Sequence, residues 1–531
     1  MKRYDAIVIG AGHNGLTAAA YLARAGKSVV VLERRPVIGG AAVSEELYPG
    51  FTYSSCSYVS SLMRPEIMRG LDLPRYGLQI IPYEGILTIL PDGDYLASYS
   101  DPDLTRRENL RHSKRDVEAF GRFSLEVLRQ CRFIKPMLLM TPPDPTSFKL
   151  DDIRGLIWMG RKFADLSERQ MYDVMRFWTM SCADFLDEYF ESEAVKGQLA
   201  GSSIIGTALG PRSPGSAYIL LHHYMGEVDG DIGAWGYARG GMGAISRALA
   251  GAAQAHDCEI RTEAEVSQII VKGGKAVGVA LADGEEVYGT AIVSNLDPKR
   301  TFLKLMPLEH LDDTFIDQVR NFKIRGSSGK LNIALDGWPE FIAKPPIPAP
   351  LYSSIQIHRT LDDLERAYDD WKNGMWSRHP YLDIVIPSGL DPTMAPPGKH
   401  YMSIFVQYVP PKLKDGPWDD AKRSAFADTV IDTLAEICPN IRDLILHMQV
   451  RSPWDLENEV GLTEGNIFQG ELTLDQLMFN RPFPGYAQYR GPLRRLYMCG
   501  SCTHPGGGVM GAPGANAARE ILKDFKRRIL R

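Results

Sequence analysis

The sequence predicts an α/β protein with a Rossmann-type nucleotide-binding domain that is built from segments far apart in the chain. Three observations lead to this fold class. An apolar run at residues 6–9 ends in a G-x-G-x-x-G turn. A second glycine-rich block, residues 237–243, precedes a helical pattern, and a third, residues 500–511, stands between an apolar run and another helical pattern.

The first unit begins with a strand at residues 6–9, which is apolar throughout, as in parallel strands buried on both faces. It runs directly into the glycine turn. There Gly10 makes the tight bend, Gly12 lets the backbone approach a pyrophosphate, and Gly15 allows a helix to pack closely on the strand.

The helical pattern at residues 16–24 completes the turn's context. The N-terminus of this helix directs backbone N–H groups toward phosphate charge, and His13 and Asn14 of the turn are expected to bind the cofactor. A second strand at residues 28–32 ends at Glu33, the position that binds a ribose hydroxyl, and a carboxylate there favours a ribose without phosphate.

The next loop favours FAD over NAD as the cofactor. Arg34 follows the acid, and the paired glycines Gly39 and Gly40 precede Ala41. Paired glycines let the backbone pass close to a second stretch of cofactor, which suits the extended FAD. The loop resembles that of the glutathione-reductase-like flavoproteins, in which it runs beside the pyrophosphate and the ribityl chain.

Strands are predicted after the second glycine block at residues 266–271, 276–281 and 291–294, separated by glycine turns. A plain β-meander would show the same pattern. The resemblance to flavoproteins places Val266 beside the adenine and returns Asn295 to the cofactor.

The third segment predicts a strand at residues 496–500 that ends in Gly500, then a glycine run that closes before a helix at residues 512–522. A glycine backbone before a helix can touch a flat ring closely and offers N–H groups to negative charge. We therefore expect Gly508, Val509 and Met510 at the pyrimidine side of the flavin, where a reduced flavin carries its charge.

Together these segments resemble the phytoene-desaturase-like FAD-dependent oxidoreductases, which are related more distantly to the amine oxidases. The stretches YARGGMGAISRAL and LYMCGSCTHPGGGVMGAPGANAARE carry the resemblance, with the N-terminal turn. HHYMGEVDGDIGAWGYARGGMG and GNIFQGELTLDQLMFNRPFPGY look most like the subgroup called pyridine nucleotide-disulfide oxidoreductase domain-containing protein 2. After Gly50 and Phe51 the desaturases usually have Asp, Gly and Pro, whereas this chain has Ser54, Cys56 and Ser57. Phytoene is therefore not carried over as the substrate.

The expected organisation is a discontinuous, glutathione-reductase-like FAD domain and a mixed α+β substrate domain with a helical insertion. The FAD domain takes residues 1–62, 237–300 and 491–531. The substrate domain takes residues 63–236 and 301–490, with the insertion near residues 100–200. A second strand–glycine–helix unit for NAD(P)H is not found in the sequence, despite the subgroup's name.

The predicted function is an FAD-dependent dehydrogenase or desaturase that forms a C=C bond by hydride transfer to flavin N5. Its substrate would be a small molecule or lipid-like, apolar or partly apolar, and electrons would pass on to oxygen, a quinone or another carrier. A flavin amine oxidase, a flavin-dependent isomerase and a non-catalytic FAD-containing assembly protein remain as alternatives. The oligomeric state is not predicted.

His504 is the catalytic candidate at the flavin face, although its role as acid–base group or packing residue stays open because no partner can be named. Cys499 and Cys502 have C-x-x-C spacing. Because a redox pair typically opens a helix and this one precedes the glycine run, we expect two small packed residues. Of His222 and His223, only one can serve a given site.

The 531 residues carry a net charge of -5, so the sequence shows no basic field for nucleic acid. No cysteine or histidine spacing indicates a metal site. The sequence shows no leader and no span of eighteen apolar residues, which predicts a cytoplasmic protein. The basic C-terminal residues 523–531 leave peripheral contact with a membrane open.

Overall fold

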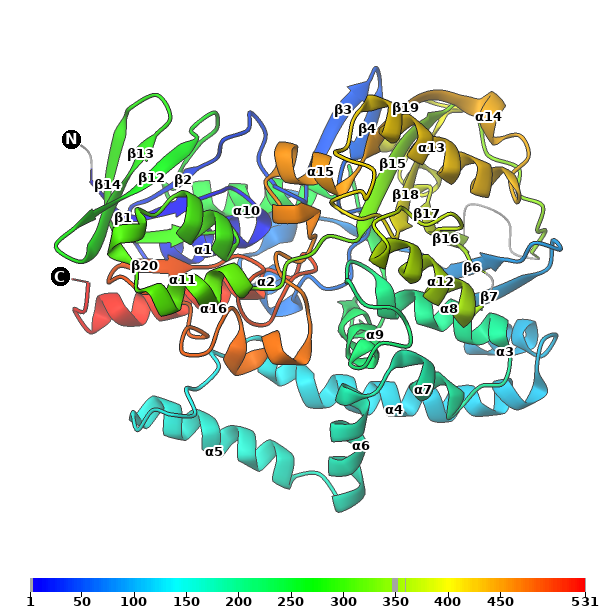
Figure 1. Ribbon diagram of the computed structural model, residues 1–531, viewed down its shortest axis with the longest axis horizontal. Helices are drawn as coiled ribbons and strands as arrows, with labels where there is room; N and C mark the ends of the chain where they lie inside the picture. Colours follow the sequence, from blue (N-terminus) through cyan, green and yellow to red (C-terminus); the bar gives the residue numbers. More distant parts are fainter. Residues whose placement is uncertain (1–2, 346–351, 359, 531) are drawn as a thin grey trace.

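The computed structural model describes residues 3–345, 352–358 and 360–530. Two seven-stranded sheets form the upper part of the molecule in Figure 1, and a group of helices from α4 to α9 lies beneath them. No helix among these described residues is long and apolar enough to cross a bilayer.

The first sheet joins the three predicted segments of the FAD domain. Its strand order is β11 (Glu259–Arg261), β2 (Val29–Leu32), β1 (Arg3–Ile9), β14 (Glu286–Ser294), β13 (Lys275–Leu281) and β12 (Val266–Lys272), with β20 (Leu496–Met498) beside β14. The strands around β1 are parallel, and β12 and β13 add an antiparallel edge. The predicted α/β Rossmann-type class is confirmed.

Alternating side chains of β1 supply the two faces of this sheet. Ala6 and Val8 pack beneath the helices α1 (His13–Arg24), α10 (Gly243–Gln254) and α16 (Ala512–Lys526). Ile7 and Ile9 pack on the other face with α11 (Asp313–Asn321). Both faces are therefore buried, which explains the uninterrupted apolar run that the sequence shows.

The second sheet is mainly antiparallel. Its strand order is β19 (Ile445–Arg451), β15 (Ser328–Leu335), β18 (His400–Gln407), β17 (Tyr381–Val385), β16 (Tyr352–Ile357), β6 (Gly85–Ile89) and β7 (Tyr95–Tyr99). Only the pairing of β16 with β6 is parallel among the described pairs. The helix α13 (Asp420–Ala435) packs against it, and α12 (Leu361–Lys372) lies at its lower side in Figure 1.

Short elements connect the two sheets. The hairpin β3 (Ser44–Tyr48) and β4 (Phe51–Ser54) leads out of the glycine loop. The helices α2 (Pro65–Gly70), α14 (Ile441–Leu444) and α15 (Pro453–Asp455) and the two-stranded pairs β5 (Ile80–Pro82) with β10 (Gly236–Ala238) and β8 (Glu227–Val228) with β9 (Asp231–Ile232) complete the connections.

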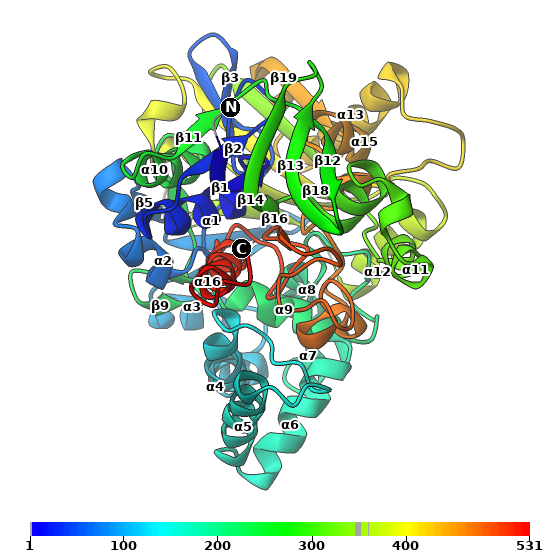
Figure 2. The same cartoon turned by 90° about the vertical axis from the view of Figure 1, so that its left-hand side faces the viewer.

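The helical insertion continues past the expected end near residue 200 and reaches Tyr224, so it is longer than the sequence predicts. Its members are α3 (Pro102–Asn109), α4 (Lys114–Leu138), α5 (Leu150–Ala164), α6 (Glu168–Thr179), α7 (Cys182–Asp187), α8 (Glu193–Ile204) and α9 (Ser216–Tyr224). α8 and α9 pack under the second sheet, whereas α5 and α6 extend away from both sheets in both views (Figures 1 and 2).

Candidate functional site

The glycine turn between β1 and α1 has the geometry that the sequence predicts. Gly10 has a φ of +92°, a left-handed conformation that favours glycine. A Cβ atom on Gly15 would lie 2.3 Å from the carbonyl oxygen of Gly10, so only glycine allows the helix to start this close to the strand. No side chain caps the N-terminus of α1, which leaves its first N–H groups for an anion.

Glu33 lies at the end of β2 and supports this turn. One carboxylate oxygen accepts a hydrogen bond from the backbone N–H of Ala11 at 2.8 Å, and the other accepts from the N–H of Arg35 at 3.0 Å. The carboxylate is almost buried at the rim of a cavity. It therefore fixes the loop and has lone pairs left for a ribose hydroxyl.

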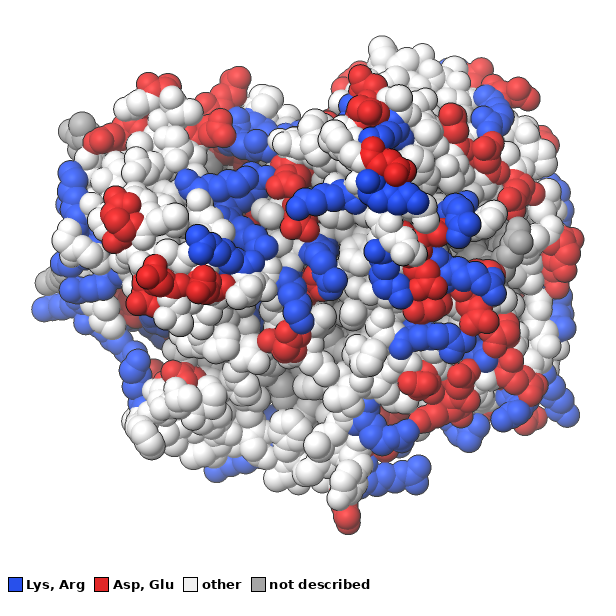
Figure 3. All heavy atoms as spheres, in the orientation of Figure 1, with Lys and Arg blue, Asp and Glu red and all other residues white. Residues whose placement is uncertain are grey.

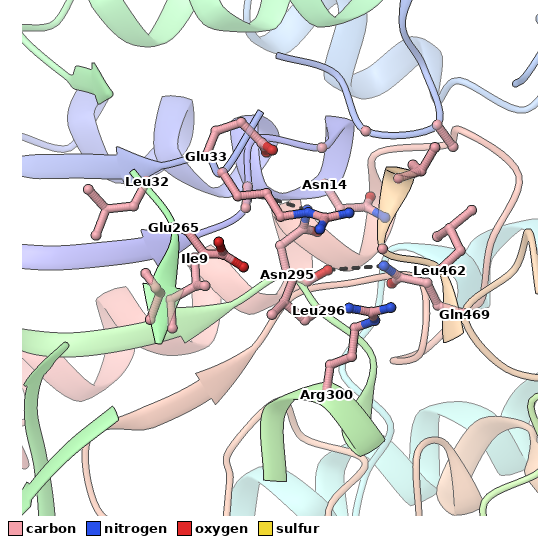
Figure 4. A pocket seen from close by; sticks show the side chains of 18 of the residues that line it. Ile9, Asn14, Leu32, Glu33, Glu265, Asn295, Leu296, Arg300, Leu462 and Gln469 are labelled. Carbon is pink, nitrogen blue, oxygen red and sulfur yellow. Dashed lines mark hydrogen bonds between the residues drawn. The ribbon is translucent and has the colours of Figure 1, made fainter. Parts of the chain in front are cut away.

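A cavity of about 320 Å³ opens in front of the turn. Ten of the predicted cofactor residues line it: Gly10, Gly12, His13, Asn14, Glu33, Arg34, Gly40, Ala41, Val266 and Asn295. Figure 4 shows Glu33, Asn14, Arg300 and Gln469 directed toward the same space from different elements. The structure thus brings together residues from distant parts of the chain, such as Asn14 and Ser501, which are 487 positions apart and hydrogen-bonded to each other.

The side chains around this cavity fit a dinucleotide. Four residues that line it have a buried polar atom without a hydrogen-bond partner in the described part of the chain: His13 Nε2, Asn14 Oδ1, Arg300 Nε, which lies 3.8 Å from an oxygen of Asp297, and Gln469 Oε1. Buried polar groups without partners are rare in native proteins, so four of them around one cavity indicate that a polar ligand completes the site.

Two arginines bring positive charge to the cavity. Arg34 donates to the carbonyl oxygens of Asn458 and Glu459 at 2.8 and 2.7 Å, and Arg300 donates to that of Glu457 at 2.9 Å. Burial, together with the nearby charge of Arg300, lowers the pKa of Arg34. A pyrophosphate would relieve the repulsion between these two guanidinium groups.

Several lining residues could not be found from the sequence. Arg300, Lys304 and Leu462 lie outside the stretches that carry the family resemblance, and only the folded chain brings them to the cavity. Gln469 and Ser501 lie within two of those stretches, but no feature of the sequence singled them out. The weak exception is Ser501, which follows the predicted Gly500 and accepts a hydrogen bond from Asn14 at 3.0 Å.

Gly15, Gly39 and Gly500 lie behind this cavity and do not line it, and each allows close packing of the backbone. The Cβ positions of Gly39 and Gly500 would lie 2.3 Å from the carbonyl oxygen of Ala42 and 2.7 Å from that of Asn295. These glycines shape the cofactor loop from behind.

A second cavity, of about 140 Å³, continues from the first and shares His13, Ala41 and Ile467 with it. Gly508 and Val509 line it, on the side where the flavin is expected. Val509 has a φ of +56°, which is unusual for a β-branched residue and marks a constrained position. The walls of this cavity are mainly apolar and include Val59, Leu62, Ile86, Ile205, Trp235, Phe405, Leu456, Ile467 and Phe468.

Met510 and His504 differ from expectation, because neither lines either cavity. Met510 is buried against Leu62 and Ala512, where the apolar packing at the start of α16 holds it. His504 is buried, and its Nε2 lies 2.8 Å from the carbonyl oxygen of Met137, while burial lowers its pKa to about 4. The geometry thus corresponds to the packing alternative for His504.

Lys330 on β15 is a buried cation in this second cavity, and no sequence pattern points to it. Its Nζ donates to the backbone oxygens of Ser54, at 2.6 Å, and of Cys56. Burial lowers the pKa of Lys330 to about 7. The residues that depart from the desaturase pattern thus position a group that can hold or release a proton near neutral pH.

The two neighbouring histidines diverge, as expected. His223 lines the second cavity, whereas His222 lies outside it with its Nε2 3.0 Å from the carbonyl oxygen of Gly507. Cys499 and Cys502 are fully buried, and burial raises the pKa of both thiols well above their usual range. A high pKa opposes thiolate formation, so this pair packs as two small side chains.

Comparison with known proteins identifies relatives along the whole chain. The family described as "Flavin containing amine oxidoreductase" matches residues 163–522, and "NAD(P)-binding Rossmann-like domain" matches residues 8–71. The mouse pyridine nucleotide-disulfide oxidoreductase domain-containing protein 2 is 41% identical, over 98% of this chain and 94% of its own length. The predicted subgroup resemblance is confirmed.

Two further relatives differ in their named substrates. A limonene dehydrogenase component of Castellaniella defragrans is 28% identical over 99% of this chain and 95% of that protein. The structure of cyclohexylamine oxidase from Brevibacterium oxydans superimposes with a TM-score of 0.57 at 16% identity, covering 99% of this chain and 100% of that one, which shows the fold. The chain therefore belongs to the family of flavin-containing amine oxidoreductases and is an FAD-dependent oxidoreductase.

Proposed function

We propose that this enzyme dehydrogenates an apolar or partly apolar small molecule, removing hydrogen from two adjacent carbons so that a C=C bond forms. The observation that carries the proposal is the second cavity, which is mainly apolar and adjoins the nucleotide cavity. A substrate held there would be next to the cofactor and largely shielded from water.

The residues of the first cavity are suited to hold the cofactor. We assign the adenosine to the side of Glu33 and Val266, and the pyrophosphate to the N-terminus of α1 with Arg34 and Arg300. When bound, FAD supplies a hydride acceptor at flavin N5.

The protein's own part in the reaction is placement and proton handling. Aromatic side chains such as Trp235, Phe405 and Phe468 restrict where an apolar substrate can lie. Lys330, with a pKa of about 7, is the basic group in the cavity that can take up a proton released from the substrate.

The limonene dehydrogenase relative supports this proposal, because its name gives a cyclic hydrocarbon as the substrate. Amine oxidation is the second candidate. It is favoured by Asp383, a buried carboxylate in the second cavity that could pair with an ammonium group. The proposal also includes an electron acceptor, which would be oxygen, a quinone or another carrier.

Anaerobic reduction of the purified holoenzyme tests the proposal. We would mix it with limonene, with perillyl alcohol and with cyclohexylamine, follow the flavin absorbance, and analyse the products by mass. We expect at least one of the two terpenoids to reduce the flavin and yield a product that is lighter by two hydrogens and carries a new C=C bond, which NMR distinguishes from an aldehyde. Reduction by cyclohexylamine alone, with formation of an imine that water hydrolyses to cyclohexanone and ammonia, would instead establish the amine oxidase.

A further inference from the structure

Part of the wall that the second sheet, here called the substrate sheet, contributes to the second cavity is polar. Ser354 and Gln356 on β16 and Asp383 on β17 all line the cavity there. Gln356 lies directly opposite Asp383 in the antiparallel pair, and Ser354 is two residues away on the same strand, so the three side chains share one face.

Asp383 is a buried carboxylate, and the groups of the described residues that hydrogen-bond to it are hydroxyls. Its two oxygens accept hydrogen bonds from Tyr58, at 2.7 Å, and from Ser354, at 3.0 Å. No cation forms an ion pair with it among the described residues. Burial raises the pKa of this carboxyl, and each oxygen retains a lone pair for another donor.

Gln356 adds a second hydrogen-bond acceptor beside Asp383. The residue is 5% exposed, and its Oε1 has no hydrogen-bond partner among the residues that the structure describes. A buried amide oxygen without a donor is costly, so a ligand that donates a hydrogen bond to it binds more tightly. The carboxylate and the amide oxygen therefore form one acceptor-rich end of a mainly apolar cavity.

Lys330 is a separate part of the same cavity. Its Nζ lies over the ring of Tyr58 at 5.1 Å from the centroid and is already bonded to two backbone oxygens. The Tyr58 ring faces this lysine, and its hydroxyl faces Asp383. Lys330 therefore does not neutralise the acceptor-rich end of the cavity, which Asp383 and Gln356 form.

We propose that Asp383 and Gln356 bind a hydrogen-bond donor on the substrate, an ammonium or a hydroxyl group, while the apolar walls enclose the rest of the molecule. The inference rests on the proposed function and narrows it from apolar substrates to those with one donor group. Because Asp383 and Gln356 come from the substrate sheet and Ala41, Gly508 and Val509 from the FAD domain, the donor group is held on the sheet side of the cavity.

Binding of four probes with the same six-membered ring tests this inference. They are methylcyclohexane, cyclohexylmethanol, cyclohexylmethylamine and cyclohexanecarboxylate, titrated into the FAD-loaded enzyme with flavin difference absorbance and saturation-transfer NMR as readouts. We expect the amine and the alcohol to bind at least tenfold more tightly than methylcyclohexane and the carboxylate. The relative strength of the first two distinguishes an ammonium from a hydroxyl substrate.

Matched variants locate the effect. Asp383→Asn should weaken amine binding at least tenfold, and Gln356→Met should weaken amine and alcohol binding severalfold while methylcyclohexane binding is kept. Asp428→Asn on the exposed side of α13 is the control that changes the same charge elsewhere. Flavin content and thermal unfolding show whether each variant is folded. If Asp383→Asn does not fold, Gln356→Met still tests the inference.

Tightest binding of the carboxylate, equal binding of all four probes, or full amine and alcohol affinity in both variants would overturn the inference. These results are independent of flavin reduction. If the donors bind as expected and no substrate is dehydrogenated, the proposed function fails and the binding site stands. If limonene and perillyl alcohol reduce the flavin equally in wild type and Asp383→Asn, the function stands and the site fails.

Discussion

At the scale of single residues, the site needs glycines, which have no side chain, at some positions and a long buried side chain at another. Gly15 brings α1 within contact of the turn before it, and Gly10 adopts the left-handed conformation that the turn requires. Lys330 is the opposite case, because its long side chain is buried and its charge is held by backbone oxygens. Gly15 and Lys330 each make a different measurable prediction.

Replacing Gly15 by alanine should weaken FAD binding at least tenfold and destabilise the fold by roughly 1–3 kcal/mol, because a Cβ there meets the Gly10 carbonyl oxygen at 2.3 Å. FAD titration and urea unfolding measure both effects. Gly160→Ala in α5 is the control, since its Cβ would have no heavy atom within 4 Å. It should leave FAD affinity unchanged and add up to ~1 kcal/mol of helix stability. Equal effects of the two substitutions would contradict the packing argument.

Lys330 should make stability depend on pH. Its pKa in the fold, about 7, lies below the ordinary lysine value of 10.5, so between these values the unfolded chain binds more protons. Stability from this residue therefore rises with pH across that window, by at most about 1.4 kcal/mol per pH unit. Urea unfolding from pH 7 to 10 should give a smaller slope for Lys330→Met than for wild type. The exposed Lys149→Met should keep the wild-type slope.

At the scale of elements, α16 closes the FAD domain by returning the end of the chain to α1 and β20. Asp524, which is 1% exposed, is one of three buried polar residues that fix this helix, together with Asn516 and Glu520. The carboxylate of Asp524 accepts hydrogen bonds from Tyr497 at 2.8 Å and from Arg490 at 2.9 and 2.8 Å. α16 thereby fixes β20, the strand that leads into the glycine run.

Removing the carboxylate of Asp524 should loosen this closure. Asp524→Ala removes the acceptor of Tyr497 and two hydrogen bonds of Arg490, which is partly exposed and keeps Glu520 as a partner, so we expect a loss of roughly 1–3 kcal/mol. Thermal unfolding and protease cleavage near the C-terminus would report it. Lys526→Ala, on the exposed side of the same helix, should change neither. A loss of stability without weaker flavin retention would separate the role of α16 in folding from its role in binding.

At the scale of the whole molecule, three distant segments meet on one cofactor, while charge is distributed without a dominant sign. Figure 3 shows basic and acidic side chains interspersed, with few of either along the lower edge where α5 and α6 lie. The apolar C-terminal residues Phe525 and Leu530 pack on the domain rather than facing outward. On α5 and α6, by contrast, Leu150, Ile157 and Met175 are exposed.

Removing FAD should destabilise the whole FAD domain. A ligand that binds only the folded state adds about 2.7 kcal/mol at a concentration of 100 Kd, so readdition of FAD should restore the thermal unfolding temperature. Riboflavin lacks the adenosine and pyrophosphate that Glu33 and the two arginines of the first cavity would bind, so it should give little of this recovery. NAD has both groups but no isoalloxazine ring, so it should give less recovery than FAD. Full recovery with NAD would reassign the nucleotide site.

The sequence by itself determined the nucleotide half of this protein. Residues 6–33 form a continuous segment of strand, turn, helix and second strand. The conformation of its glycines and the position of its terminal acid follow from neighbouring residues, so Gly10, Gly12 and Glu33 could be placed without a structure. Val509 could be placed beside a cavity for the same reason, since the glycine run next to it is local.

The substrate half was decided only by tertiary structure. Lys330, Gln356 and Asp383 come from three strands of one antiparallel sheet, and no local pattern distinguishes them from other buried polar residues. His504 shows the converse, because its place in a motif suggested the flavin face while packing against Met137 positions it elsewhere. A backbone conformation is encoded by neighbours in the chain, whereas a cavity is lined by residues that meet only when distant strands pair.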